Sequence, residues 1–206
     1  HGALYMLGAF VAWLLLDKLG INYRFALVLA PLTVGALGVV IERLFLKHLY
    51  KLDPLYGLLL TFGLALIIEG IFRELFGSSG QEYPVPALLQ GATNLGFMIL
   101  PIYRTWVVVV SLAVCLGTWY LIERTRLGAY LRAGTENASL VQAFGINVPV
   151  MVTLTYGAGA ALAGLAGVLA APIIQVNPLM GSNLIIVVFA VVVIGGMGSI
   201  MGAIVT

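Results

Sequence analysis

Side chains that could carry out catalysis or bind a metal ion are few in this sequence, and they are not grouped at useful spacings. Neither of the two histidines, His1 and His48, has carboxylates at metal-ligand spacing, and the single cysteine, Cys115, lies in an apolar run without a nearby base. The sequence has no glycine-rich phosphate loop with a lysine. We therefore expect no catalytic residues, no metal, no cofactor and no ATP hydrolysis by this chain itself.

Three glycines within five residues interrupt the last apolar run, at Gly195, Gly196 and Gly198, and Ser199 follows them. They do not match the dinucleotide-binding pattern Gly-x-Gly-x-x-Gly, and no βαβ unit is expected around them. Each glycine weakens a helix by about 1 kcal/mol relative to alanine, and a broken helix in lipid survives only where protein or water satisfies its backbone. The motif predicts either a kink for close packing or part of a translocation path.

Three polar side chains are further candidates for such a path. Glu69 lies inside the apolar run 55–72, where an ionisable group is costly, and Arg73 follows it at the i+4 position. We interpret the two as a paired couple, with a role of Glu69 in the path as the alternative. Asn177 and Asn183 flank a break before the last run, where they either meet a substrate or a partner or serve as turn residues.

The composition indicates that lipid surrounds most of the chain. Hydrophobic residues make up 62% of the sequence and charged residues 9%, whereas soluble domains have about 25% charged residues. The mean hydropathy is +1.11. So few charges cannot cover the surface of a soluble fold of 206 residues. A net charge of +2 gives no indication of nucleic-acid binding.

The apolar runs predict an all-α, polytopic transmembrane helix bundle with about six spans, forming a single membrane domain over residues 1–206. A bilayer core needs about 20 apolar residues in a helix. The first and last runs meet the ends of the sequence, so we expect a fragment of a longer chain. The predicted spans are residues 3–16, 25–41, 55–72, 106–122 and 150–174. A sixth span begins with residues 184–194 and is interrupted by the glycines that follow.

The distribution of basic residues predicts the orientation. Six of the ten Lys and Arg residues lie in the second and fourth loops, so the positive-inside rule places these loops in the cytoplasm. The long third loop, residues 77–104, then faces outward. In the fifth span, Gly159, Ala163 and Gly167 recur every four residues, and we expect this face to pack closely against other helices.

The fourth loop contains a short amphipathic helix. Asn137 is a suitable N-cap and Gly145 a suitable C-terminal stop, about two turns apart. Leu140, Val141 and Phe144 share one face of the helix between them. Such a face either presses into a groove on another protein or lies in the lipid interface, and the pattern alone does not choose between these two possibilities.

Several motifs, in order along nearly the whole chain, follow the pattern of one transport family. They are His1 to Ala9, Gly128, Arg132-Ala133, Glu136-Asn137, Gly145-Ile146-Asn147, Leu154-Thr155-Tyr156, Val176-Asn177-Pro178 and Val193 to Ala203. In this order they resemble the permease subunits of branched-chain amino acid ABC importers.

The resemblance implies a bacterial inner-membrane protein whose segment 127–147 is a cytoplasmic coupling segment. That segment would dock on cytoplasmic ABC ATPase subunits, while a periplasmic binding protein delivers the substrate and a related second permease completes a heterodimer. The implied coupling residues are Arg132, Ala133, Glu136, Asn137, Leu140, Val141, Phe144, Gly145 and Ile146.

Two differences from the family pattern concern the coupling face and the substrate. Val141 stands where alanine is common, and the run 185–193 replaces a Lys-Ala-Phe pattern. The resemblance implies branched-chain or other hydrophobic amino acids as substrates. Permeases for urea and short amides share the Val-Val-Ile-Gly-Gly run and are the alternative. An ion-coupled secondary carrier would need carboxylates deep in its spans, where only Glu69 is a candidate.

Overall fold

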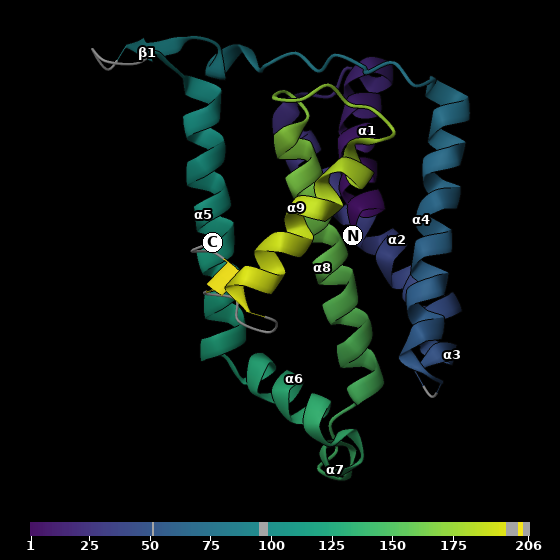
Figure 1. Cartoon of the computed structure of the whole chain (residues 1–206). Helices are drawn as coiled ribbons and strands as arrows, with labels where there is room; N and C mark the ends of the chain where they lie inside the picture. Colours follow the sequence, from purple (N-terminus) through teal and green to yellow (C-terminus); the bar gives the residue numbers. More distant parts are fainter. Residues whose placement is uncertain (51, 95–98, 197–201, 204–206) are drawn as a thin grey trace. The chain divides into compact units, whose positions relative to one another are not determined.

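The computed structural model describes the whole chain except residues 51, 95–98, 197–201 and 204–206, and the side chains at 54, 93, 94 and 99. Helices make up most of the described chain (Figure 1), which confirms the predicted all-α fold. Five helices among the described residues are long and apolar enough to cross a membrane, and the apolar helix Met180–Gly195 is shorter.

The five membrane-spanning candidates follow the predicted runs, and four of them are longer than predicted, whereas the fifth ends at Ala170 and not at residue 174. They are α1 (Gly2–Leu19), α2 (Tyr23–Ile41) continued by the π-helix η1 (Glu42–Leu46) and α3 (Lys47–Leu49), α4 (Pro54–Phe76), α5 (Ile102–Arg124) and α8 (Val148–Ala170). The remaining elements are the 3₁₀ helix η2 (Ala87–Leu89), strands β1 (Ala92–Asn94) and β2 (Ile99–Pro101), α6 (Arg126–Glu136), α7 (Ala138–Ala143) and α9 (Met180–Gly195).

Helix ends lie where the sequence supplies suitable caps. The Asp53 side chain accepts a hydrogen bond from the Leu55 amide at 2.9 Å, and Pro54 takes the first helical position of α4. The same helix ends before Gly77, whose φ of 74° is a left-handed value that favours glycine.

Contacts divide the chain into two compact units. The first comprises His1–Pro86 and Tyr156–Ile186, and the second Ala87–Thr155 and Val187–Thr206. In the second, the antiparallel pair β1–β2 lies in the predicted third loop, and α5 runs from this pair to α6 (Figure 1).

In the first unit, glycines bring helix backbones into direct contact. A Cβ atom added to Gly8 of α1 would lie 2.1 Å from the carbonyl oxygen of Gly164 in α8, and one added to Gly167 would lie 2.0 Å from that of Tyr5. Helix association in lipid depends on such close packing because burying apolar side chains away from lipid gives no hydrophobic gain. The glycines therefore set how near α1 and α8 approach.

The contact face of α8 differs from the predicted one. Gly159 has open space where a Cβ would stand, whereas Gly157, Gly164 and Gly167 meet neighbouring backbone or side chains at 2.5, 2.9 and 2.0 Å. The prediction for Gly159 is therefore wrong. An α-helix has 3.6 residues per turn, so each step of four residues moves the side chain about 40° around the axis. Residues at i, i+4 and i+8 therefore drift away from one face, whereas residues at alternating steps of three and four remain on it.

Aromatic rings join α1 to α4 in the same unit. The fully buried ring of Phe10 lies 4.8 Å from that of Phe72 and 5.2 Å from that of Phe76, centroid to centroid. Trp13 contacts Phe76 edge-on at 5.6 Å. These rings form the α1 side of the core, while large apolar side chains elsewhere on α4 are exposed, as expected of a helix that meets lipid or further protein.

Candidate coupling segment and translocation-path residues

The helix α7 forms as the sequence predicted. The Asn137 side chain accepts a hydrogen bond from the Leu140 amide at 3.1 Å and another from the Ser139 hydroxyl at 2.7 Å. The helix ends at Ala143, and Gly145 has a φ of 82°, which a residue with a Cβ adopts only with strain. The cap and the glycine therefore fix both ends of a short, exposed helix.

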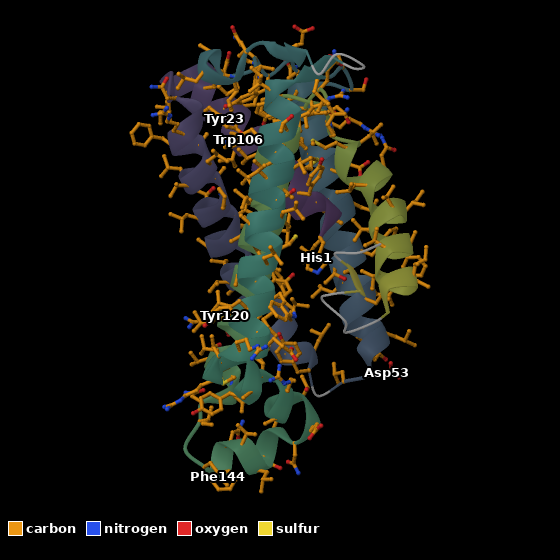
Figure 2. The ribbon with its side chains drawn as sticks, turned by 90° about the vertical axis from the view of Figure 1, so that its left-hand side faces the viewer. His1, Tyr23, Asp53, Trp106, Tyr120 and Phe144 are labelled. Carbon is orange, nitrogen blue, oxygen red and sulfur yellow. The ribbon has the colours of Figure 1, made fainter. Side chains whose placement is uncertain are left out.

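The apolar residues of α7 and its C-cap residue Phe144 divide between a buried and an exposed side. Val141 is buried, with 6% of its surface exposed, and holds the helix on its own chain. Leu140 and Phe144 are 56% and 76% exposed. Figure 2 shows Phe144 at the tip of the segment, beyond the end of α5 that carries Tyr120. Two large apolar side chains are thus available to a partner surface.

The other predicted coupling residues have different surroundings. Ala133 and Glu136 are exposed on α6, and Ile146 is half-buried after Gly145. Arg132 is exposed, but its guanidinium donates to the Ile122 carbonyl at 3.0 Å and lies 3.4 Å from the Glu123 carboxylate. Arg132 therefore contacts the end of α5 in its own chain.

Glu69 has partners on two helices. Its carboxylate lies 3.6 Å from the Arg73 guanidinium on α4, in the paired arrangement that the spacing suggested. It also accepts a hydrogen bond from the Ser182 hydroxyl, at the start of α9. Glu69 thus joins α4 to α9 in the first unit.

The two asparagines lie near the start of α9. The Asn177 side chain accepts from the Leu179 amide at 3.0 Å and donates to the Gln175 carbonyl at 3.3 Å, which is the bonding of a turn residue. Asn183 is exposed on α9, one residue after Ser182. Close by in the chain, a cavity of about 480 Å³ is lined by Glu82, Tyr83, Pro84 and the five residues 171–175.

The glycine motif ends the last apolar helix. The helix α9 stops at Gly195, and Gly196 has a φ of 89°. A Cβ at Gly195 would lie 2.7 Å from the Ala203 amide nitrogen, so the chain returns to close backbone contact there. The predicted break is confirmed at Gly195 and Gly196, whereas Gly198 and Ser199 lie outside the described residues.

A buried carboxylate was missed by the sequence analysis. The predicted second span ends at residue 41, directly before Glu42. In the structure the helix continues through η1 and α3, and Glu42 is 1% exposed. The Tyr50 hydroxyl donates to its carboxylate at 3.0 Å. A π-helical turn such as η1 often marks a functional position. The feature of the sequence that could have indicated a buried Glu42 is its position directly after an uninterrupted apolar run.

Tyr50 should contribute to stability in a pH-dependent way. Burial, followed by the hydrogen bond to Glu42 and its charge, raises the pKa of Tyr50 to about 12 from the ordinary 10. Because the folded state holds this proton more tightly, its contribution is complete below pH 10 and is lost between pH 10 and about 12. We expect Tyr50→Phe to cost about 1 kcal/mol at neutral pH and to reduce that alkaline loss. Melting temperatures across pH 8–12 in detergent check this, and an unchanged alkaline profile would contradict it.

Replacing Tyr83 by phenylalanine should raise the stability at neutral pH, whereas the same replacement at Tyr50 should lower it. The Tyr83 hydroxyl is buried, and it has no hydrogen-bond partner among the described residues. Burial raises the pKa of Tyr83 to about 12. Its ring packs edge-on against that of Tyr23 at 6.1 Å, a contact that phenylalanine retains. We expect Tyr83→Phe to stabilise the protein by about 1 kcal/mol, because an unsatisfied buried hydroxyl is removed. The exposed Tyr120→Phe is the control, and a lower melting temperature for Tyr83→Phe would refute the expectation.

Comparisons with known proteins cover the whole chain. The sequence model of the family described as "Branched-chain amino acid transport system / permease component" matches residues 1–206. No solved structure matches the chain.

Three curated relatives have similar descriptions. The high-affinity branched-chain amino acid transport system permease protein BraD of Pseudomonas aeruginosa is 30% identical, over 98% of this chain and 70% of its own length. The LivH permease protein of Escherichia coli K12 is 28% identical over the same shares. The probable LivH permease protein of Methanocaldococcus jannaschii is 31% identical, over 100% of this chain and 66% of its own. With its membrane-spanning helices, the chain therefore belongs to the permease-component family of branched-chain amino acid transport systems, as a multi-pass protein of the inner membrane.

Proposed function

We propose that this chain is the permease subunit of an ABC importer that moves branched-chain or other hydrophobic amino acids across the bacterial inner membrane. The observation that carries the proposal is the exposed apolar pair Leu140 and Phe144 on a helix with fixed ends. A short helix of this kind can insert into a groove of an ATPase subunit. The descriptions of the relatives favour amino acids over urea or short amides as substrates.

The coupling segment is residues 127–147, within one permease domain that comprises the whole chain. Its contact residues are Leu140 and Phe144, with Ala133, Glu136 and Ile146 around them, while Asn137, Val141 and Gly145 hold the helix in shape. The basic second and fourth loops support a cytoplasmic position for the segment. The partners on that side are two cytoplasmic ABC ATPase subunits, which hydrolyse the ATP.

On the other side, a periplasmic binding protein delivers the amino acid to a path formed with a related second permease in a heterodimer. The path-lining residues in this chain are Glu69, Asn177, Asn183, Gly195, Gly196, Gly198 and Ser199. Glu69 is paired with Arg73 and bonded to Ser182, so it connects α4 and α9 at the wall of the path.

The transport cycle follows from these parts. ATP binding brings the two ATPase subunits together. This motion moves α7 of this chain, which contacts one ATPase subunit, and the corresponding helix of the second permease, which contacts the other. Because α7 continues into the membrane spans through α6 and α8, its motion tilts those spans. The path then opens to one side of the membrane at a time, and the glycine break at Gly195–Gly196 lets the end of α9 change direction.

Reconstitution tests the proposal directly. The chain is placed in proteoliposomes with its second permease, its ATPases and the binding protein, and uptake of radiolabelled leucine is followed. We expect uptake only with ATP and the binding protein present. Ion-driven uptake by the chain alone, without ATP, would instead identify a secondary carrier.

A further inference from the structure

We propose that residues 121–132 form a rigid joint between α5 and α6. Gly128 and Arg132 hold this joint by their contacts with the Ile122 carbonyl oxygen, and Arg132 is a positioning residue for coupling through it. The consequence for transport rests on the proposed function, whereas the rigidity of the joint does not depend on that function. In this proposal Arg132 does not touch the ATPase but holds the segment that does.

The end of α5 has carbonyl groups that its own helix cannot satisfy. The last four carbonyls of any helix lack intrahelical partners. Here two of the four, at Leu121 and Ile122, accept hydrogen bonds from side chains of the joint. The Thr125 hydroxyl donates to the Leu121 carbonyl, and the Arg132 guanidinium donates to the Ile122 carbonyl at 3.0 Å. The joint is therefore bonded at two successive positions of the helix end.

Gly128 allows α6 to approach that end closely. A Cβ added at Gly128 would lie 1.6 Å from the Ile122 carbonyl oxygen and 2.8 Å from the Ile122 Cα, the closest approach of any described glycine. Gly128 is also the one buried residue of α6. Since these contacts are with backbone, no side-chain rotation can make room for a methyl group, and the joint itself would have to open.

Gly128 and Arg132 act on the same atom. They are four residues apart, so they share one face of α6, and both meet the Ile122 carbonyl oxygen. Glu123 lies 3.4 Å from the same guanidinium nitrogen and keeps the arginine in place. One residue therefore permits the contact and the other bonds it, which fixes the angle at which α6 leaves α5 (Figure 1).

A rigid joint has a direct consequence for coupling. Residues 126–136 lie between the membrane span α5 and the exposed helix α7. If the joint bends freely, motion of α7 is absorbed between α6 and α5 and does not reach the membrane. With the joint fixed, α6 and α5 move as one body. Loss of Arg132 should then uncouple ATP hydrolysis from uptake without removing the ATPase.

A distance measurement tests the joint itself. Nitroxide labels at the exposed native Cys115 of α5 and at Thr135→Cys near the end of α6 report the distribution of distances across the joint in nanodiscs. We expect Arg132→Ala and Gly128→Ala to broaden or shift the distribution. Arg126→Ala and Gly117→Ala are matched controls, because Arg126 makes no ion pair among the described residues and Gly117 has open space beside it. An unchanged distribution in both joint variants would overturn the proposal.

Transport assays on the complete importer give the second test. We expect Arg132→Ala to co-purify with the ATPase subunits at the wild-type level, while uptake per ATP hydrolysed falls at least fivefold and Arg126→Ala stays normal. Arg132→Lys should recover part of the loss, because an ammonium can still donate to one carbonyl. Loss of co-purification with an unchanged distance distribution would make Arg132 a docking contact and refute its positioning role. Absence of ATP-driven uptake in the wild type would reject the proposed function and leave the distance test valid.

Discussion

Gly167→Val should prevent formation of the folded protein, whereas Gly159→Val on the same helix should be tolerated. The added Cβ at Gly167 would stand 2.0 Å from the Tyr5 carbonyl oxygen and 2.9 Å from the Ala9 amide nitrogen, both backbone atoms of α1. At Gly159 nothing lies within 4 Å. Overpacking against backbone cannot be relieved by a rotamer change, so we expect about 4 kcal/mol of destabilisation or more at Gly167.

Size-exclusion profiles and thermal melts in detergent measure this difference. Both variants add the same side chain to a glycine of α8, so helix propensity affects them equally, and only the contact with α1 differs. A single monodisperse peak with near wild-type melting is expected for Gly159→Val, and aggregation for Gly167→Val. Equal behaviour of the two would show that α1 and α8 do not pack as described.

Replacing Leu140 and Phe144 together by serine should remove the ATPase subunits from the purified complex. Both side chains are exposed, and a docked apolar residue at the centre of an interface often contributes about 2 kcal/mol or more. The two together would weaken docking by roughly 100- to 1000-fold, since about 1.4 kcal/mol corresponds to a tenfold change in affinity. ATP-driven uptake should be lost to the same extent.

Leu19→Ser is the matched control for this pair. Leu19 is similarly exposed, at the end of α1, and carries no part of the proposed interface. Quantifying the ATPase bound to affinity-purified permease compares the variants, and the melting temperature of the isolated chain confirms that each still folds. Full retention of the ATPase in the double variant would exclude α7 as the docking helix.

Local features of this fold could be predicted from the sequence because their causes are local. Apolar run length predicted the spans, and Asn137 and Gly145 predicted both ends of α7. Each of these depends on residues within a few positions of one another.

Features set by contacts between elements could not be predicted in the same way. Charged residues usually mark the ends of spans, so Glu42 was placed at a boundary, although the helix continues and buries it beside Tyr50. The face of α8 that meets α1 depends on the neighbouring backbone, which a glycine count does not contain. Arg132 was interpreted as a partner contact because nothing in the sequence shows its bond to the Ile122 carbonyl.

Cysteine labelling shows on which side of the membrane α7 lies, and so whether α7 can reach a cytoplasmic ATPase. In a Cys115→Ser background, single cysteines at the exposed residues Gln142 of α7 and Leu88 of η2 are exposed to a thiol reagent that cannot cross the membrane. The chain is expressed without the ATPases, and sealed inside-out and right-side-out vesicles are compared. We expect Gln142→Cys to react only in inside-out vesicles and Leu88→Cys only in right-side-out vesicles. Reaction of Gln142→Cys from the outer side would contradict coupling to a cytoplasmic ATPase.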